Sequence, residues 1–136
     1  KFSSTIKNKL TNGSTYNIKS SLMFLSDQEL NSLLSTASLC IFPYRDFSGQ
    51  SGIACKAASF GTPIACSNHQ GLANISIDPS FVLEKLTKDD LAKFISHHID
   101  SIDLETREKQ LKVIQHSSWE KVAKMHTELY SSLLKP

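Results

Sequence analysis

The sequence predicts an α/β fold in which a parallel sheet is covered by helices on both faces. Short apolar runs typical of buried strands alternate with longer segments of helical spacing along the 136 residues. Residues 38–66 also read as strand, glycine-rich loop, helix and strand, which is the βαβ unit of parallel sheets. Hydrophobic residues make up 40% and charged residues 21% of the chain, as in ordinary globular domains. We therefore expect residues 1–136 to form one domain with its own core.

The N-terminal part of the chain predicts a helix, a strand and a second helix. Residues 4–10 favour a short helix, which a turn at residues 12–13 closes. Residues 21–25 form a short apolar run, which we expect to be a buried strand. Ser26 and Glu29 have the spacing of a capping box and start the second helix. Four residues of that helix are spaced to face inward: Leu30, Leu33, Leu34 and Ala37.

The central part contains the predicted βαβ unit. We expect a strand over residues 38–43, a polar loop after it, and a helix of small residues over residues 51–60. Gly61 ends that helix, and residues 63–66 form the next strand. The loop therefore lies at the carboxyl end of the first strand, where open α/β sheets bind their ligands.

The C-terminal part predicts one more strand and two helices. Residues 80–83 favour a short strand, and residues 87–98 a helix that begins at a threonine cap. Asp103 can cap the helix that follows. Three residues of the helix at 87–98 are spaced to face inward: Leu91, Phe94 and Ile95.

The last predicted helix begins at a second capping box, formed by Ser117 and Glu120. Its apolar and aromatic positions fall on a single stripe: Trp119, Val122, His126, Leu129, Tyr130 and Leu133. We expect this stripe to pack Trp119 and Tyr130 against the body of the domain.

Charge and hydropathy disfavour several classes of function. The net charge of +2 is too small, and the lysines too scattered, to indicate a nucleic-acid-binding protein. No apolar run approaches the length of a membrane span, and the first residues do not resemble a signal peptide. Because the chain does not begin with methionine, we expect it to be cut from a longer protein.

The three cysteines favour a reducing compartment. Cys40, Cys55 and Cys66 are an odd number, and each lies among apolar or small residues, where a free thiol behaves as a small hydrophobe. Cys66 and His69 have the spacing of half a metal site, but the sequence offers no second pair of ligands. We therefore expect buried free thiols and no metal or cofactor.

The loop after residues 38–43 carries the strongest functional signal. Ser48, Gly49, Gln50, Ser51 and Gly52 combine two glycines with neutral hydrogen-bonding side chains directly before a helix. The glycines allow close backbone approach and unusual φ values, and the free N–H groups of a helix start suit a phosphate or sugar hydroxyls. An ordinary βα turn with a serine cap is the structural alternative.

A longer segment around this loop resembles a known family. The chain contains "PYRDFSGQSGIACKAASFGTPIACSNHQGL", preceded by "LMFLSDQELNSLLSTASLCIFPY" and followed by "SSWEKVAKMHTELYSSLL". From about residue 18 to its end, it resembles the donor-binding domain of the large family of retaining glycosyltransferases that use nucleotide-sugars. The resemblance implies a Rossmann-like sheet that is truncated at its N-terminal side. It also implies a second Rossmann-like domain that faces this one across a cleft. In family members, additional βα units upstream of the position of Lys1 supply the basic residues for the donor diphosphate, and no equivalent pair can be assigned here.

The resemblance assigns donor contacts to further residues. It implies that Phe24 and Leu25 bind the base through main-chain groups and that Gly71 forms a glycine turn beside the donor. Arg45 follows the strand into the cleft and can touch donor or acceptor, although it can equally well only shape the loop.

The chain departs from the best-known family pattern at two positions. Many members carry a pair of glutamates, one that contacts the sugar and one that grips the ribose. Ser48 and Lys56 stand at the matching positions, and neither can act as a carboxylate. Lys56 can approach a phosphate, but a solvated helix lysine is the simpler account. The Gln-Ser-Gly form resembles a branch of the family without the paired acids, and the sequence identifies no catalytic residue.

The resemblance leads to one expected function and two alternatives. We expect the donor-binding domain of a cytoplasmic enzyme that transfers a sugar from a nucleoside-diphosphate sugar to a glycan or lipid-linked acceptor, building a surface polysaccharide or glycolipid. Its partners would be donor, acceptor, the upstream domain and, through other parts, a membrane surface. One alternative is an epimerase-like enzyme acting on nucleotide-sugars, although this chain lacks the acidic and histidine residues of such sites. The other is a non-catalytic α/β interaction module, which the missing glutamates favour and the intact loop opposes.

Overall fold

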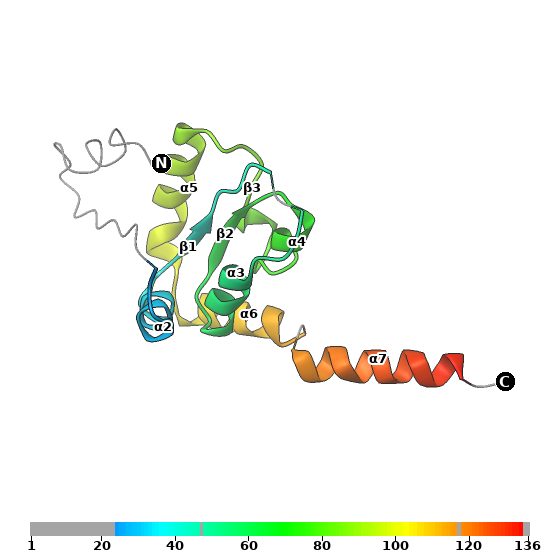
Figure 1. Cartoon of the computed structure of the whole chain (residues 1–136). Coiled ribbons are helices and arrows are strands. Elements are labelled where there is room, and N and C mark those ends of the chain that lie inside the picture. Colours follow the sequence, from blue (N-terminus) through cyan, green and yellow to red (C-terminus); the bar gives the residue numbers. More distant parts are fainter. Residues whose placement is uncertain (1–23, 47, 117, 135–136) are drawn as a thin grey trace. The chain divides into compact units, whose positions relative to one another are not determined.

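The computed structural model describes residues 24–46, 48–116 and 118–134 (Figure 1). The chain divides into two compact units, Lys1–Leu30 and Asn31–Pro136. The helix predicted at residues 4–10 lies outside the described residues, as does most of the strand predicted at residues 21–25. The two described residues of that strand, Phe24 and Leu25, have no regular secondary structure.

The second unit contains a parallel three-stranded sheet, in the order β1 (Cys40–Phe42), β2 (Ile64–Ser67) and β3 (Val82–Leu83). Ile41 pairs with Ala65, and Ser67 with Leu83. The prediction of an α/β fold with parallel strands is confirmed. The strands lie within or beside their predicted ranges because each is a short apolar run between a helix and a polar turn.

Helices lie on both faces of the sheet, as predicted. On one face, Ala65 and Leu83 form a buried cluster with Phe81 and Phe94, the latter from α5 (Lys88–His98). Neighbouring strand residues point to opposite faces, so the buried Ile64 and Cys66 lie on the other face. There α3 (Gly52–Ser59) packs against β1 and β2, and α4 (Gln70–Ala73) against β2. A short 3-10 turn, η1 (Pro79–Phe81), leads into β3.

Several helices begin at the caps that the sequence indicates. In α2 (Asp27–Thr36), the Ser26 N–H donates to the Glu29 carboxylate at 2.8 Å, and the Glu29 N–H donates to the Ser26 hydroxyl at 3.3 Å. Asp103 forms a capping box with Thr106 at the start of α6 (Leu104–Gln115). This cap lowers the pKa of the Asp103 carboxyl, chiefly because the Thr106 N–H donates to its ionised form.

The carboxyl end of α2 is held by donors from other elements. The Thr62 hydroxyl donates to the Leu34 carbonyl at 2.6 Å, and the Arg107 guanidinium donates to the Ala37 carbonyl at 2.5 Å. These bonds satisfy carbonyls that a helix end leaves without partners. Leu34 is buried as predicted, whereas Leu33 is 56% exposed, so its predicted inward position is wrong. The helical spacing identified an apolar side of α2 but overestimated its width.

Gly61 ends α3 in a left-handed conformation, with a φ of 71°. A Cβ atom built here would lie 3.1 Å from Leu111 Cγ and 3.2 Å from the Arg107 carbonyl oxygen, both on α6. The glycine therefore allows both the turn after α3 and the close packing of α3 on α6.

Replacing Gly61 with alanine should destabilise the protein by about 2 kcal/mol. The left-handed conformation costs an L-residue roughly 1–2 kcal/mol, and the added methyl also presses on α6. Urea denaturation followed by circular dichroism measures the change. As a matched control, Gly52→Ala places its methyl in open space and should alter the unfolding free energy by less than about 0.5 kcal/mol. Equal stability of the two variants would contradict this account.

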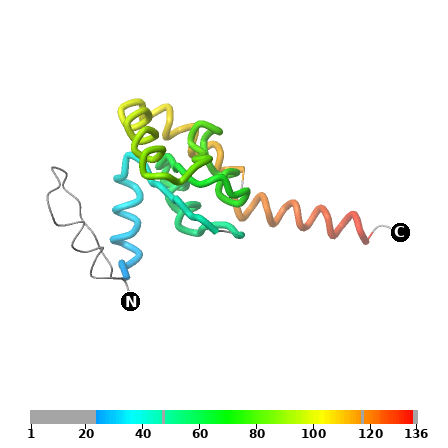
Figure 2. The backbone as a smooth tube through the Cα atoms, turned by 90° about the horizontal axis from the view of Figure 1, so that it is seen from above, coloured from blue at the N-terminus to red at the C-terminus, as the bar shows by residue number. Residues whose placement is uncertain are grey.

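The C-terminal helices follow a 3-10 turn, η2 (Ile99–Ser101), and are α6 and α7 (Trp119–Leu133) (Figure 2). Two predictions for α7 are wrong. Its cap is Ser118, whose hydroxyl accepts from the Lys121 N–H, and not Ser117. Trp119 is 88% and Tyr130 62% exposed, so neither packs against the domain. The apolar stripe shows that one side of the helix favours burial, but it does not specify the surface that covers it.

The three cysteines are free thiols, but only Cys66 is buried as expected, whereas Cys40 and Cys55 are partly exposed. Burial raises the pKa of Cys66 to about 11 and also raises the pKa of Cys40 and Cys55. The thiol of Cys66 is therefore neutral at physiological pH and a poor nucleophile, as expected for a buried packing residue. Within the described part of the chain, no helix is long and apolar enough to span a membrane.

Candidate ligand-binding site

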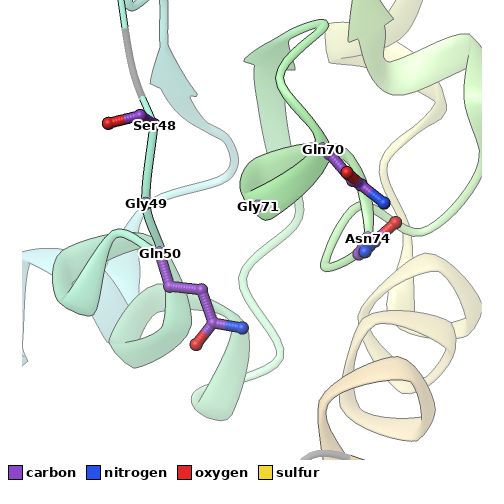
Figure 3. Close-up of a pocket in the computed structure, with 6 residues that line it drawn as sticks. All are labelled: Ser48, Gly49, Gln50, Gln70, Gly71 and Asn74. Carbon is purple, nitrogen blue, oxygen red and sulfur yellow. The ribbon is translucent and has the colours of Figure 1, made fainter.

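A pocket of about 430 Å³ lies where the loops leave β1 and β2. Parallel strands bring their carboxyl ends to the same edge of a sheet, so the loop after β1 and the segment after β2 meet there. In Figure 3, Ser48 and Gln50 lie on one wall of the pocket, and Gln70 and Asn74 lie on the other. The described lining consists of six residues: Ser48, Gly49, Gln50, Gln70, Gly71 and Asn74.

Two glycines bring the walls of this pocket into contact. A Cβ atom built on Gly71 would overlap the carbonyl group of Gly49, 2.9 Å from its carbon. The obstacle is backbone, which cannot rotate away as a flexible side chain does. Only glycine at position 71 fits this arrangement without moving the loop.

His69 makes a second link between the two loops. Its Nε2 lies 3.1 Å from the carbonyl oxygen of Tyr44, which is two residues after the end of β1. Because a carbonyl can only accept, Nε2 carries the proton and donates. His69 therefore braces the segment after β2 against the segment after β1, directly beside Gly71. The sequence suggested only half a metal site here. Among the described residues, no group of three or more metal-ligating side chains is present.

A fully buried glutamine on α6, Gln110, connects β2 to the segment that carries one wall of the pocket. The Gln110 carboxamide accepts from the Ile64 N–H at 3.2 Å and donates to the Ile75 carbonyl at 2.8 Å. It thereby ties the start of β2 to the residue just after Asn74 on the pocket wall. The Ser76 hydroxyl adds a longer bond of 3.4 Å to the Ile64 carbonyl.

The start of α3 has the serine cap that the sequence offered as the structural alternative. Ser51 is a buried cap whose hydroxyl accepts from the Ala54 N–H at 3.3 Å, so its side chain serves the helix. Gly52 is exposed and does not line the pocket. The N–H groups of Gly52 and Ile53 have no intrahelical partner, as in every first turn.

The unusual φ values allowed for Gly49 and Gly52 are not adopted. Among the described residues only Gly61 has a positive φ. The close approach expected of the loop glycines is found at Gly49, where it depends on Gly71. The glycines of this site therefore allow the two loops to approach each other closely, while the backbone stays in ordinary conformations.

Two further predicted donor contacts of the second unit, Arg45 and Lys56, do not line this pocket. Arg45 is exposed in the loop after β1, and Lys56 is half-buried on α3. Phe24 and Leu25 belong to the first unit, so their proposed base contact stays a prediction. The structure thus brings together Ser48, Gly49, Gln50 and Gly71. Four other predicted residues of the second unit do not line the pocket: Arg45, Ser51, Gly52 and Lys56.

Sequence reasoning missed two lining residues, Gln70 and Asn74, and both braces, His69 and Gln110. A usable signal was present for the first pair, since they lie four residues apart around Gly71 and so share one side of a helical turn. No local pattern marks Gln110, because its partners lie 35 and 46 residues away.

The described lining is polar and uncharged. It offers three carboxamides, one hydroxyl and backbone groups, but neither a carboxylate nor a cation. Such a surface can bind a polar ligand by hydrogen bonds, but it supplies no general acid or base. Catalysis would need groups from outside these six residues.

A second, more open pocket of about 390 Å³ lies beyond β3 and along α5. It contains Glu84, held by the Asn68 carboxamide at 3.0 and 3.1 Å, and His98, whose ring packs on Phe81 and Phe94. Burial, with the adjacent His97, lowers the pKa of His98 despite the opposing charge of Asp78. This histidine is therefore a packing residue that favours its neutral form.

Comparison with known proteins returned no matching family model, no matching curated protein and no matching solved structure.

Proposed function

We propose that this chain is the donor-binding domain of a glycosyltransferase that uses a nucleoside-diphosphate sugar. One observation carries the proposal: the loop at Ser48–Gln50 and the turn at Gly71, two parts of the segment that resembles this family, line one pocket. That pocket lies at the carboxyl edge of a parallel sheet, the position where Rossmann-like folds bind nucleotides.

The chemistry of glycosyl transfer matches the groups available here. Negative charge develops on the leaving diphosphate, and N–H groups at the start of α3 can stabilise it. The sugar must be held in a fixed orientation, for which the hydrogen-bonding side chains of the pocket are suited. In this proposal the chain binds and positions the donor. The basic residues for the diphosphate belong to further βα units of the same domain, and the acceptor site belongs to a second domain.

A thermal-shift panel on the 136-residue chain tests the proposal. The panel contains UDP, GDP, ADP and dTDP with their glucose or mannose conjugates. A diphosphate present at about one hundred times its Kd should stabilise the chain by roughly 2.7 kcal/mol. Adenosine, uridine and inorganic pyrophosphate serve as controls and should produce smaller shifts. If no diphosphate or conjugate raises Tm at millimolar concentration, the proposed function is wrong.

One observation favours the non-catalytic interaction module as a second candidate. The apolar residues of α7 are exposed, including Trp119, Met125 and Leu133. Exposed apolar surface of this kind is typical of an interaction site. Nucleotide binding distinguishes the two candidates, because an interaction module has no need to bind a diphosphate.

A further inference from the structure

We infer that the pocket lined by Gln50, Gln70 and Asn74 selects an uncharged sugar, which its three carboxamides bind through the sugar hydroxyls. This inference rests on the proposed function and adds the class of sugar that the donor carries. It also assigns a specificity role to Gln70 and Asn74.

The three carboxamides are available for a ligand. The side chains of Gln50, Gln70 and Asn74 have no hydrogen-bond partner among the described residues, whereas the nearby Gln110 and Asn68 amides are both engaged. Figure 3 places Gln70 and Asn74 side by side on one wall, while the Ser48 hydroxyl points away from them. Side-chain contacts to a ligand would therefore come mainly from the amides.

A carboxamide is matched to a hydroxyl group. Its oxygen accepts and its NH₂ group donates, and a sugar hydroxyl can do both, so each amide can bind neighbouring hydroxyls. The pocket volume of about 430 Å³ falls within the range of roughly 300–1,000 Å³ found for small-molecule sites. The loops that carry the three exposed amides are held together by the Gly71–Gly49 approach and the His69–Tyr44 bond.

The lining offers no compensation for a charged sugar. A carboxylate or ammonium group needs an opposite charge or several strong hydrogen bonds to offset its loss of water. The described lining contains neither cation nor carboxylate. A uronate or amino sugar would therefore gain less from this pocket than a neutral hexose gains. The pocket should therefore favour an uncharged sugar, because its described lining carries no charge that could pair with a charged one.

Ligand-detected saturation-transfer NMR on the 136-residue chain tests the inference. UDP-glucose, GDP-mannose and ADP-glucose are compared with their diphosphates, and UDP-glucuronate and GDP-mannuronate with the matching neutral donors. Gln70→Met combined with Asn74→Leu removes two amides and keeps the side-chain size. Gln115→Met, on the exposed part of α6, is the control.

We expect a neutral donor to bind more tightly than its diphosphate and to receive saturation at its sugar protons. The double variant should bind that donor about tenfold more weakly and bind the diphosphate with unchanged affinity. The saturation transfer to the sugar protons should be lost, and Gln115→Met should behave as the wild type does. The uronate should bind no more tightly than the diphosphate.

The inference is overturned if the double variant binds the neutral donor as the wild type does, or if the uronate binds equally well. In either case diphosphate binding would leave the proposed function standing. If neither diphosphates nor donors bind, the proposed function fails and the inference fails with it.

Discussion

Replacing Gln110 with leucine should destabilise the protein by about 3 kcal/mol. The substitution preserves most of the side-chain volume but leaves the Ile64 N–H and the Ile75 carbonyl without their buried partner. Each such unsatisfied group costs roughly 1–3 kcal/mol. Because β2 and the pocket wall after α4 are both affected, we expect Tm to fall by roughly 10–20 °C.

Urea denaturation and thermal melts of Gln110→Leu measure this effect. Gln115→Leu makes the same chemical change on the exposed surface of the same helix and should stay within about 0.5 kcal/mol of wild type. A loss below about 1 kcal/mol for Gln110→Leu would mean that water or backbone movement replaces the amide. Gln110 would then not be a brace of the pocket.

Much of the fold could be predicted because its helices and strands depend on patterns between residues close together in the sequence. The capping box of Ser26 and Glu29, the Asp103 cap and the glycine after α3 fixed the helix bounds to within about two residues. The strands followed from apolar runs between these helices. The parallel arrangement followed from strand–helix alternation, since parallel strands need a crossover.

The candidate site could be predicted only in part, for the same reason. Ser48, Gly49 and Gln50 lie in the loop between β1 and α3, so their position at the sheet edge is a local consequence of the βαβ unit. Gly71 was singled out by resemblance alone. Its contact with Gly49 is a tertiary contact between residues 22 positions apart, and no pattern of sequence spacing predicts it.

The remaining uncertainty concerns packing and hydrogen-bonding partners, which a periodic sequence pattern does not identify. The spacing of Trp119 and Tyr130 shows that α7 has an apolar side, and the structure leaves both residues exposed. The Ser51 hydroxyl accepts from the Ala54 N–H, and its predicted ligand contact stays a prediction. A serine before a helix can bond its own backbone or a ligand, and the sequence looks the same in both cases.

Replacing Gly71 with alanine should open the candidate site. The new methyl would overlap the Gly49 carbonyl, so the two loops must separate, and the Ser48–Gln50 wall must move away from α4. We expect a loss of about 1–3 kcal/mol in unfolding free energy, as for other overpacked positions. Any donor that binds the wild-type chain should bind at least about tenfold more weakly, because a displaced wall no longer meets the ligand in the right geometry.

Three measurements separate this local effect from general destabilisation. The ¹⁵N amide resonances of Ser48, Gly49 and Gln50 should shift in Gly71→Ala, whereas those of the α5 core around Phe94 should not. Gly61→Ala provides a control of similar stability loss at a position away from the lining, and it should keep the wild-type resonances of the loop and the wild-type affinity for the donor. Urea denaturation of both variants verifies that the stability losses are comparable. Unchanged loop resonances in Gly71→Ala would mean that residues 48–50 do not rest against Gly71, and the pocket as described would be wrong.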